Sequence, residues 1–165
     1  MQVARPPCAV CVRSARYFAV DATPTTVASY EFRWDGARMH PLRPRCQVIP
    51  RTSQAEAELR AALEVLMDTA QEGGPCPKCG SPPLAVVGGD ADAARAALNK
   101  GYSCSSRFRE LMRPVFRRAV RPHVVRIPGK DNAGDGPSRD REVTPEEMAA
   151  TQRILRVAAV ALEVG

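Results

Sequence analysis

The sequence lacks the features of membrane and exported proteins. No stretch approaches the roughly 18 consecutive apolar residues that a membrane-spanning helix needs. The first eight residues contain no charged segment followed by an apolar run, so they do not resemble a secretory signal. We therefore expect an intracellular protein, in the cytoplasm or in the nucleus or nucleoid, without a membrane partner. In a reducing compartment, paired cysteines bind metal more often than they form disulfides.

Large aromatic side chains are also scarce, with one Trp, three Tyr and four Phe among 165 residues. The 15 Pro and 11 Gly residues predict many turns and short elements. A chain with so few large core residues often needs a disulfide or metal cross-link to be stable.

Recognisable catalytic patterns are missing as well. The sequence contains no Ser/His/Asp arrangement, no phosphate-binding loop and no Gly-rich dinucleotide pattern. Its two histidines and scattered carboxylates form no evident acid–base pair, and Asp131 and Asp135 are interpreted as solvated turn residues. We therefore predict a protein that is not an enzyme.

The six cysteines, in contrast, follow a pattern. Cys8 and Cys11 form one Cys-x-x-Cys unit, and Cys76 and Cys79 form a second. This spacing lets two thiolates of one tight turn reach the same ion, and zinc prefers four nitrogen or sulfur ligands. The segment from Pro75 to Gly80 resembles the knuckle of zinc-ribbon proteins. The resemblance covers six residues and implies zinc as a structural cofactor.

Two ligand groupings remain open from the sequence. In the first, which needs no histidine and is slightly favoured, the four paired cysteines bind one ion and leave Cys46 and Cys104 as ordinary buried thiols. In the second, each half of the chain builds its own zinc site. The ligand sets would then be Cys8, Cys11, Cys46 and His40 in one half, and Cys76, Cys79, Cys104 and His123 in the other.

The expected elements are short. Alternating apolar residues predict β-structure over residues 16–50, with a hairpin turn at Asp35-Gly36. Helices are predicted over 53–70, 91–100 and 105–121, the last kinked by Pro114, and from Thr144 onward, where Pro145 and Glu147 suit a helix start.

These elements predict an α+β protein. It would have an N-terminal β-hairpin region, one or two zinc knuckles and three to four helices. The expected segments are a β-region plus helix (1–74), a zinc-knuckle and basic helical region (75–126), a linker or exposed loop (127–143) and a C-terminal helix (144–165).

The net charge of +6 is concentrated in one segment. Residues 101–130 contain eight basic residues against one acidic residue, so the rest of the chain sums to −1. On a helix, four arginines at four-residue spacing would form a stripe, which three more would widen. In chain order the predicted nucleic-acid-binding residues are Arg107, Arg109, Arg113, Arg117, Arg118, Arg121 and Arg126. Guanidinium groups suit bidentate contacts with phosphate, so this stripe predicts binding to a nucleic-acid backbone.

Together these features predict a non-enzymatic, zinc-binding, nucleic-acid-binding accessory protein. It would be a subunit of a larger nucleoprotein complex, in transcription, genome handling or RNA-guided work, with protein partners in that complex. The alternative is a zinc-stabilised protein–protein adaptor that docks through its C-terminal helix, where Leu155 and Leu162 lie on the apolar stripe.

Overall fold

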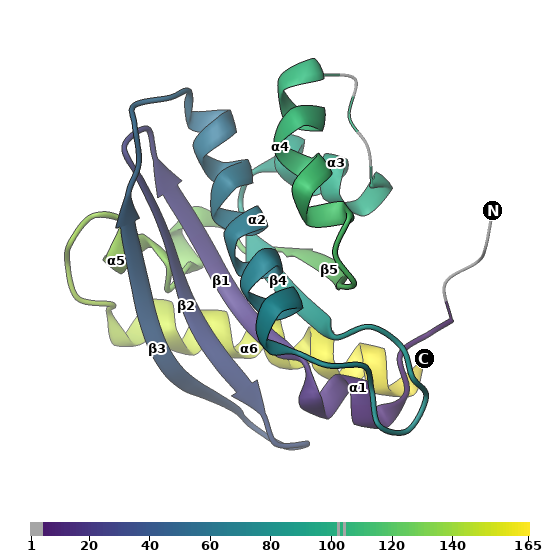
Figure 1. Cartoon of the computed structure of the whole chain (residues 1–165). Helices are drawn as coiled ribbons and strands as arrows, with labels where there is room; N and C mark the ends of the chain where they lie inside the picture. Colours follow the sequence, from purple (N-terminus) through teal and green to yellow (C-terminus); the bar gives the residue numbers. More distant parts are fainter. Residues whose placement is uncertain (1–4, 102, 104) are drawn as a thin grey trace.

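A single mixed β-sheet organises the chain (Figure 1). The computed structural model describes residues 5–101, 103 and 105–165. The strand order across the sheet is β3-β2-β1-β4-β5. The strands are β1 (Arg16–Thr23), β2 (Thr26–Trp34), β3 (Met39–Val48), β4 (Leu84–Gly89) and β5 (Arg121–Arg126). The first three strands are antiparallel neighbours, whereas β4 runs parallel to β1 and β5 runs parallel to β4.

Helices cover both faces of this sheet (Figure 1). One apolar core lies between the sheet and α2, α3 and α4. A second core lies on the other face, against α1 and α6. The helices are α1 (Ala9–Ser14), α2 (Gln54–Glu72), α3 (Asp92–Lys100), α4 (Ser106–Phe116), α5 (Asp135–Ser138) and α6 (Pro145–Val164), with a 3-10 turn at Gly129–Asp131.

The central strand β1 shows how the two cores arise. Phe18 and Val20 belong to the core beneath α2, whereas Tyr17 and Ala19 belong to the core beneath α6. Successive side chains of a strand point to opposite faces, so a strand covered on both faces is apolar almost throughout. Asp21 is the carboxylate that interrupts this pattern, near the end of the strand.

Several local predictions are confirmed. The hairpin turn at Asp35-Gly36 joins β2 to β3, and Gly36 adopts the left-handed φ of 97°. The helix expected from residue 53 is α2, and the Ser53 side chain accepts a hydrogen bond from the Glu56 backbone. The start of α6 has both hydrogen bonds of a capping box between Thr144 and Glu147.

The predicted fold class is wrong. The expected hairpin region is part of a five-stranded mixed sheet, and the described residues form six α-helices instead of three to four. The sequence misled because α4 ends at Phe116, capped by Arg117, whereas the arginine spacing continues to Arg121. Residues 121–126 instead form β5, which pairs with β4. Parallel pairing joins strands that are distant in sequence, so local periodicity does not reveal it.

The segment 127–143, expected as a linker or exposed loop, folds against the sheet and buries Asn132 and Ser138. No helix in the described ranges combines the length and the apolar character needed to cross a bilayer.

Candidate functional site

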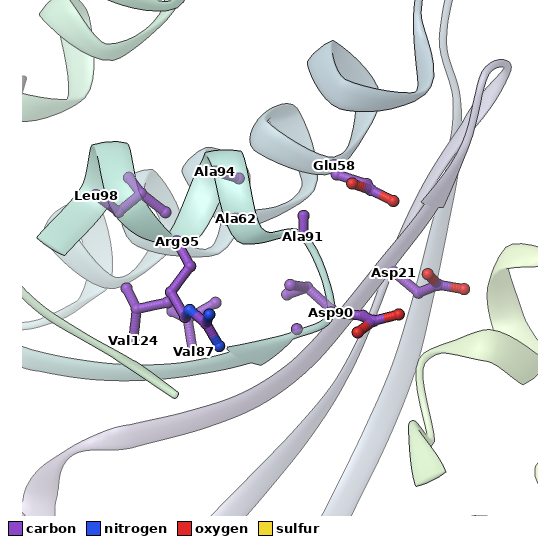
Figure 2. Close-up of a pocket in the computed structure, with 12 residues that line it drawn as sticks. Asp21, Glu58, Ala62, Val87, Asp90, Ala91, Ala94, Arg95, Leu98 and Val124 are labelled. Atoms are coloured by element: carbon purple, nitrogen blue, oxygen red, sulfur yellow. The ribbon is translucent and has the colours of Figure 1, made fainter. Parts of the chain in front are cut away.

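The ends of two strands and the beginning of one helix bring three carboxylates to the same edge of the sheet. Asp21 lies near the end of β1, and Asp90 directly follows β4. Because these strands are parallel neighbours, their carboxyl ends lie at the same edge. β3 ends at that edge too, so α2 begins there and supplies Glu58. The three side chains line one cavity, and Figure 2 shows them at one end of it, with apolar side chains lining the rest.

A fourth carboxylate comes from α5. The carboxyl of Asp135 lies within hydrogen-bond contact of Asp21. The preceding loop is fixed to β1, because Asn132 Nδ2 donates to the Val20 carbonyl at 2.8 Å and Asn132 Oδ1 accepts from Gly134 N at 2.7 Å. A Cβ at Gly134 would lie only 3.1 Å from the Ala19 carbonyl oxygen, so glycine suits this close approach of the loop to β1.

Among the four carboxylates of this site, Asp21 is the one whose pKa is most affected by its surroundings. Burial raises its pKa to about 6, and the nearby charge of Asp135 raises it as well. A hydrogen bond from Ser138 Oγ to Asp21 Oδ2, 2.8 Å long, acts in the opposite direction. Ser138 is buried, so this hydroxyl fixes the orientation of the carboxylate.

Asp135 has a different environment. Burial acts to raise the pKa of Asp135, but Arg139 and Arg141 outweigh it, and the net shift is downward. Arg139 Nε donates to Asp135 Oδ1 at 2.9 Å, and Arg141 Nη2 donates to Asp135 Oδ2. Arg141 also forms two bonds to Glu147, which closes the capping box of α6. The interpretation of Asp135 as a solvated turn residue is therefore wrong.

The remaining two carboxylates are more weakly held. Glu58 Oε1 accepts from the Gln54 amide at 2.9 Å, one helical turn earlier. Asp90 Oδ1 lies 3.4 Å from Arg126 Nη2. All four groups offer hard oxygen ligands, which suit Mg²⁺ or Mn²⁺. Asp21 and Asp135 are in contact and repel each other when both are ionised, so a divalent cation bound by them would relieve this repulsion, and the donor set fits such a cation.

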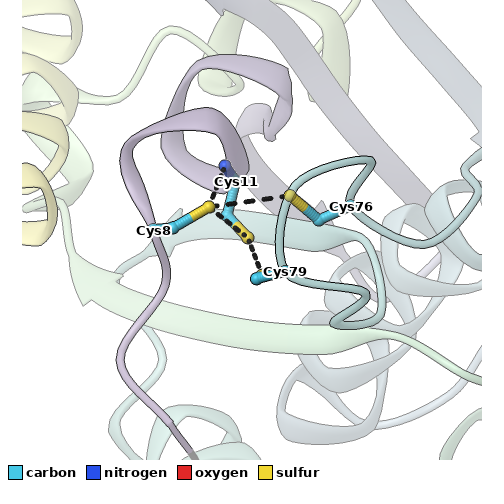
Figure 3. Close-up of side chains that lie close together, drawn as sticks. All are labelled: Cys8, Cys11, Cys76 and Cys79. Carbon is cyan, nitrogen blue, oxygen red and sulfur yellow. Dashed lines mark hydrogen bonds between the residues drawn. The ribbon is translucent and has the colours of Figure 1, made fainter.

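The four paired cysteines also converge (Figure 3). Their sulfur atoms all lie within 4.8 Å of one another. Cys8 Sγ lies 3.6 Å from Cys11 Sγ and 3.6 Å from Cys76 Sγ, and Cys11 Sγ lies 3.3 Å from Cys79 Sγ. These separations are far longer than a disulfide bond and close to the edge of about 3.8 Å expected for four sulfurs around zinc. The cysteine cluster can therefore hold a metal ion.

Local backbone structure prepares this cysteine cluster. Cys8 caps α1, and its Sγ accepts from Cys11 N. The second pair lies on a turn between α2 and β4, closed by a bond from Gly80 N to the Cys76 carbonyl. Hydrogen bonding from Ser81 lowers the pKa of Cys79 to about 6, whereas burial raises that of Cys11 to about 12. The cluster therefore joins α1 to the loop before β4, at the sheet edge opposite the carboxylates.

The other predicted metal ligands lie apart from this cluster. Cys46 is exposed on the edge strand β3, so the prediction of a buried thiol at this position is wrong. His40 Nε2 lies 2.6 Å from Asp35 Oδ2, and His123 is on β5 opposite Val86. Cys104 lies outside the described residues.

The predicted arginines do not form one helical stripe. Arg107, Arg109 and Arg113 lie on α4, whereas Arg121 and Arg126 begin and end β5. Arg117 caps α4 and Arg118 follows it. Arg107 pairs with Glu56 of α2 at 2.8 Å and with Glu110 at 3.1 Å, and Arg126 faces Asp90. Arg109 Nη1 donates to the Ser103 carbonyl at 2.9 Å.

Solved structures identify this architecture. LC11-RNase H1, solved in complex with an RNA/DNA hybrid, is similar with a TM-score of 0.56 and 15% identity, covering 77% of this chain and 94% of that chain. The N-terminal RNase H domain of rv2228c from Mycobacterium tuberculosis also gives 0.56, at 16% identity, with 85% and 98% covered. The chain has a ribonuclease H-like fold. No protein-family model matches the sequence, and no curated protein matches it.

These findings correct the predicted function. The ribonuclease H-like fold, found with nuclease structures as neighbours, overturns the prediction of a non-enzymatic accessory protein or adaptor. Sequence reasoning missed Asp21, Glu58 and Asp90 because no local motif joins them. A signal was present, since Asp21 and Asp90 each follow a short apolar run that predicts a buried strand end.

Proposed function

We propose that the chain is a divalent-cation-dependent nuclease that hydrolyses the RNA strand of an RNA/DNA hybrid. The observation that carries this proposal is the convergence of four carboxylates from β1, α2, β4 and α5 on one edge of a ribonuclease H-like sheet. Carboxylate-bound divalent cations are a recurring solution for phosphodiester hydrolysis, because they stabilise both the attacking and the leaving oxygen.

Asp21, Glu58, Asp90 and Asp135 would hold these cations. When bound, the cations supply Lewis-acid polarisation of the phosphate and lower the pKa of an attacking water. The residues of the chain provide the geometry. Ser138 orients Asp21, Asn132 fixes the loop that carries Asp135, and α2 places Glu58 across the cavity.

The proposed substrate rests on two observations. LC11-RNase H1 was solved with an RNA/DNA hybrid. In addition, the basic helix α4 packs against α2, the helix that carries Glu58. The Arg107–Glu56 pair links the two helices two residues before Glu58. Arg113 and Arg117 are exposed on this helix and at its end. They are therefore suited to contact the phosphate backbone of a hybrid bound at the carboxylates.

Zinc is the proposed occupant of the cysteine cluster. Four thiolates bound to one ion are typical of structural zinc sites, which leave no position open for substrate. The ion would hold α1 against the loop between α2 and β4. This role is separate from hydrolysis, because the two clusters lie at opposite edges of the sheet.

A substrate panel tests the proposed activity. Purified protein with Mg²⁺ or Mn²⁺ is incubated with labelled RNA/DNA hybrid, duplex DNA, duplex RNA and single-stranded RNA of one sequence. We expect cleavage of the RNA in the hybrid, and none with EDTA. The Asp90→Asn variant should lose this cleavage, because it removes a cation ligand.

Asp92→Asn is the matched control for this experiment. Asp92 is an exposed carboxylate two residues further along. It pairs with Arg95 and does not itself line the cavity. Its substitution should leave cleavage within about twofold of the unmodified protein, as for most exposed surface changes. Equal cleavage by the Asp90→Asn variant would attribute the activity to a contaminant and contradict the proposal.

A further inference from the structure

Asp135 differs from the other carboxylates in having both of its oxygens engaged by guanidinium groups. Arg139 bonds to Oδ1, and Arg141 bonds to Oδ2. Apart from the contact between Asp21 and Asp135, the groups that donate to Asp21 and Glu58 in the described residues are neutral: a hydroxyl, a backbone amide and a side-chain amide. Asp90 faces Arg126 only at the longer distance of 3.4 Å. Asp135 is therefore the one proposed cation ligand that is in close contact with two positively charged side chains.

The two arginines can leave Asp135 without losing all their partners. Arg141 Nη1 lies 2.9 Å from Glu147 Oε1, and Arg141 Nη2 lies 2.7 Å from Glu147 Oε2, so one guanidinium is shared between two carboxylates. Arg139 has a side chain that is 64% exposed, so it can turn into solvent. A cation approaching Asp135 would thus displace Arg141 toward Glu147 and Arg139 toward water.

We propose that Arg139 and Arg141 are an internal counter-charge for Asp135, which a divalent cation must displace before Asp135 becomes a ligand. This inference rests on the proposed function and concerns the regulation of the same site. Two guanidinium groups in contact with one carboxylate repel an incoming cation and occupy the lone pairs that it needs. The cation bound through Asp135 is therefore the weaker one, and its occupancy depends on the cation concentration.

The arrangement also explains why Asp135 can lie against Asp21 in the absence of a cation. Two carboxylates in contact repel each other when both are ionised. The arginines compensate for this repulsion on the Asp135 side. They therefore keep the loop that carries Asp135 in place, so that a cation meets an assembled site.

Titration with Mn²⁺ tests the inference. The sample is zinc-loaded protein without substrate at pH 8. Binding is measured by isothermal titration calorimetry and by the decrease of the electron paramagnetic resonance signal of free Mn²⁺. We expect unmodified protein to show a tighter and a weaker site. Arg139→Gln should bind the weaker Mn²⁺ roughly two- to fivefold more tightly, the range expected for an exposed ion pair.

Two further variants separate charge from structure. Arg139→Lys keeps the positive charge and should restore the weak affinity. Arg153→Gln removes one charge from the exposed face of α6, away from the carboxylates, and should change nothing. Thermal unfolding without cation verifies that each variant is folded.

The possible failures are distinguishable. If Arg139→Gln binds Mn²⁺ as weakly as unmodified protein, or more weakly, the counter-charge inference is overturned while the proposed function stands. If unmodified protein binds no Mn²⁺ that Asp21→Asn removes, the carboxylates are not a cation site, and the proposed function falls with the inference.

Discussion

At the scale of single residues, Asp21 determines how the carboxylate site responds to pH. Its pKa lies at about 6 in the folded chain, against an ordinary value of 3.8, chiefly because it is buried. A raised carboxyl pKa means that the folded state binds a proton more tightly than the unfolded state does. The resulting stability is fully present below pH 3.8 and is lost as the pH rises through about 6.

The cation-free protein should therefore lose stability relative to the Asp21→Asn variant between about pH 4 and pH 6. The expected change in the difference between the two unfolding free energies is up to about 3 kcal/mol. Chemical denaturation of both proteins across this range measures it. A difference that stays constant from pH 4 to pH 7 would contradict the assigned environment of Asp21. Added Mg²⁺ should reverse the loss above pH 6, because the cation replaces the proton.

The same residues show what sequence reasoning could reach within the site. The four clustered cysteines were identified because both pairs carry their spacing in the local sequence. The carboxylates were not, because Asp21, Glu58, Asp90 and Asp135 are separated by 114 residues from first to last. They meet only through strand order and through the buried bond of Asn132 to β1. A carboxylate at the end of an apolar strand is a usable signal, but the local sequence does not show which other carboxylates lie next to it in the fold.

At the scale of elements, the cysteine cluster stabilises the short helix α1, which buries too few side chains to be held in place by packing alone. α1 has six residues and buries only Cys11 and Val12. A helix of this length is not stable by itself in water. Its connection through four sulfurs to the turn before β4 is therefore the main constraint on this part of the chain.

The Cys76→Ser variant should lose the bound ion and lower the melting temperature on the order of 10 °C, as expected when a structural metal site is lost from a domain of this size. Native mass spectrometry should find one zinc per chain in the unmodified protein and none in the variant. Cys46→Ser, on the exposed edge strand, is the matched control and should retain the ion and the melting temperature. Metal loss from the Cys46→Ser variant would argue for a different ligand set.

Elements with strong local signals were predicted well, and those defined by pairing were not. α2 and α6 have capping residues and apolar stripes that can be read within one segment. β5 has neither, since its six residues include three basic or imidazole side chains and a proline. Its identity as a strand comes from hydrogen bonding to β4, which the sequence of residues 121–126 does not encode by itself.

At the scale of the whole molecule, the sheet separates two kinds of metal chemistry. Soft sulfur ligands gather where β1 and β4 begin, and hard oxygen ligands gather where they end. Positive charge is concentrated in residues 101–130, but it is spread between the two edges. Arg107 at the start of α4 and Arg126 at the end of β5 lie beside the carboxylate edge, whereas Arg121 begins β5 at the sulfur edge. The start of α4 and the end of β5 therefore offer basic side chains next to the oxygen cluster, where a negatively charged substrate would be held.

Binding of an RNA/DNA hybrid should consequently weaken with salt. Arg113→Gln on α4 should reduce the slope of log affinity against log salt by about one, and weaken binding equally for unrelated sequences. Fluorescence anisotropy without divalent cations measures this. Arg153→Gln on α6 carries the same charge change and should leave the slope unaltered. Equal slopes for the two variants would place the hybrid away from α4.

Cleavage of a uniformly labelled RNA/DNA hybrid under single-turnover conditions tests the central claim most directly. The account predicts Mg²⁺-dependent hydrolysis of the RNA strand by unmodified protein, with a rate reduced at least about a hundredfold in the Asp21→Asn variant. The Cys46→Ser protein should cleave at the unmodified rate. Hydrolysis that persists in Asp21→Asn, or a folded, zinc-loaded protein that binds the hybrid and never cleaves it, would contradict the account.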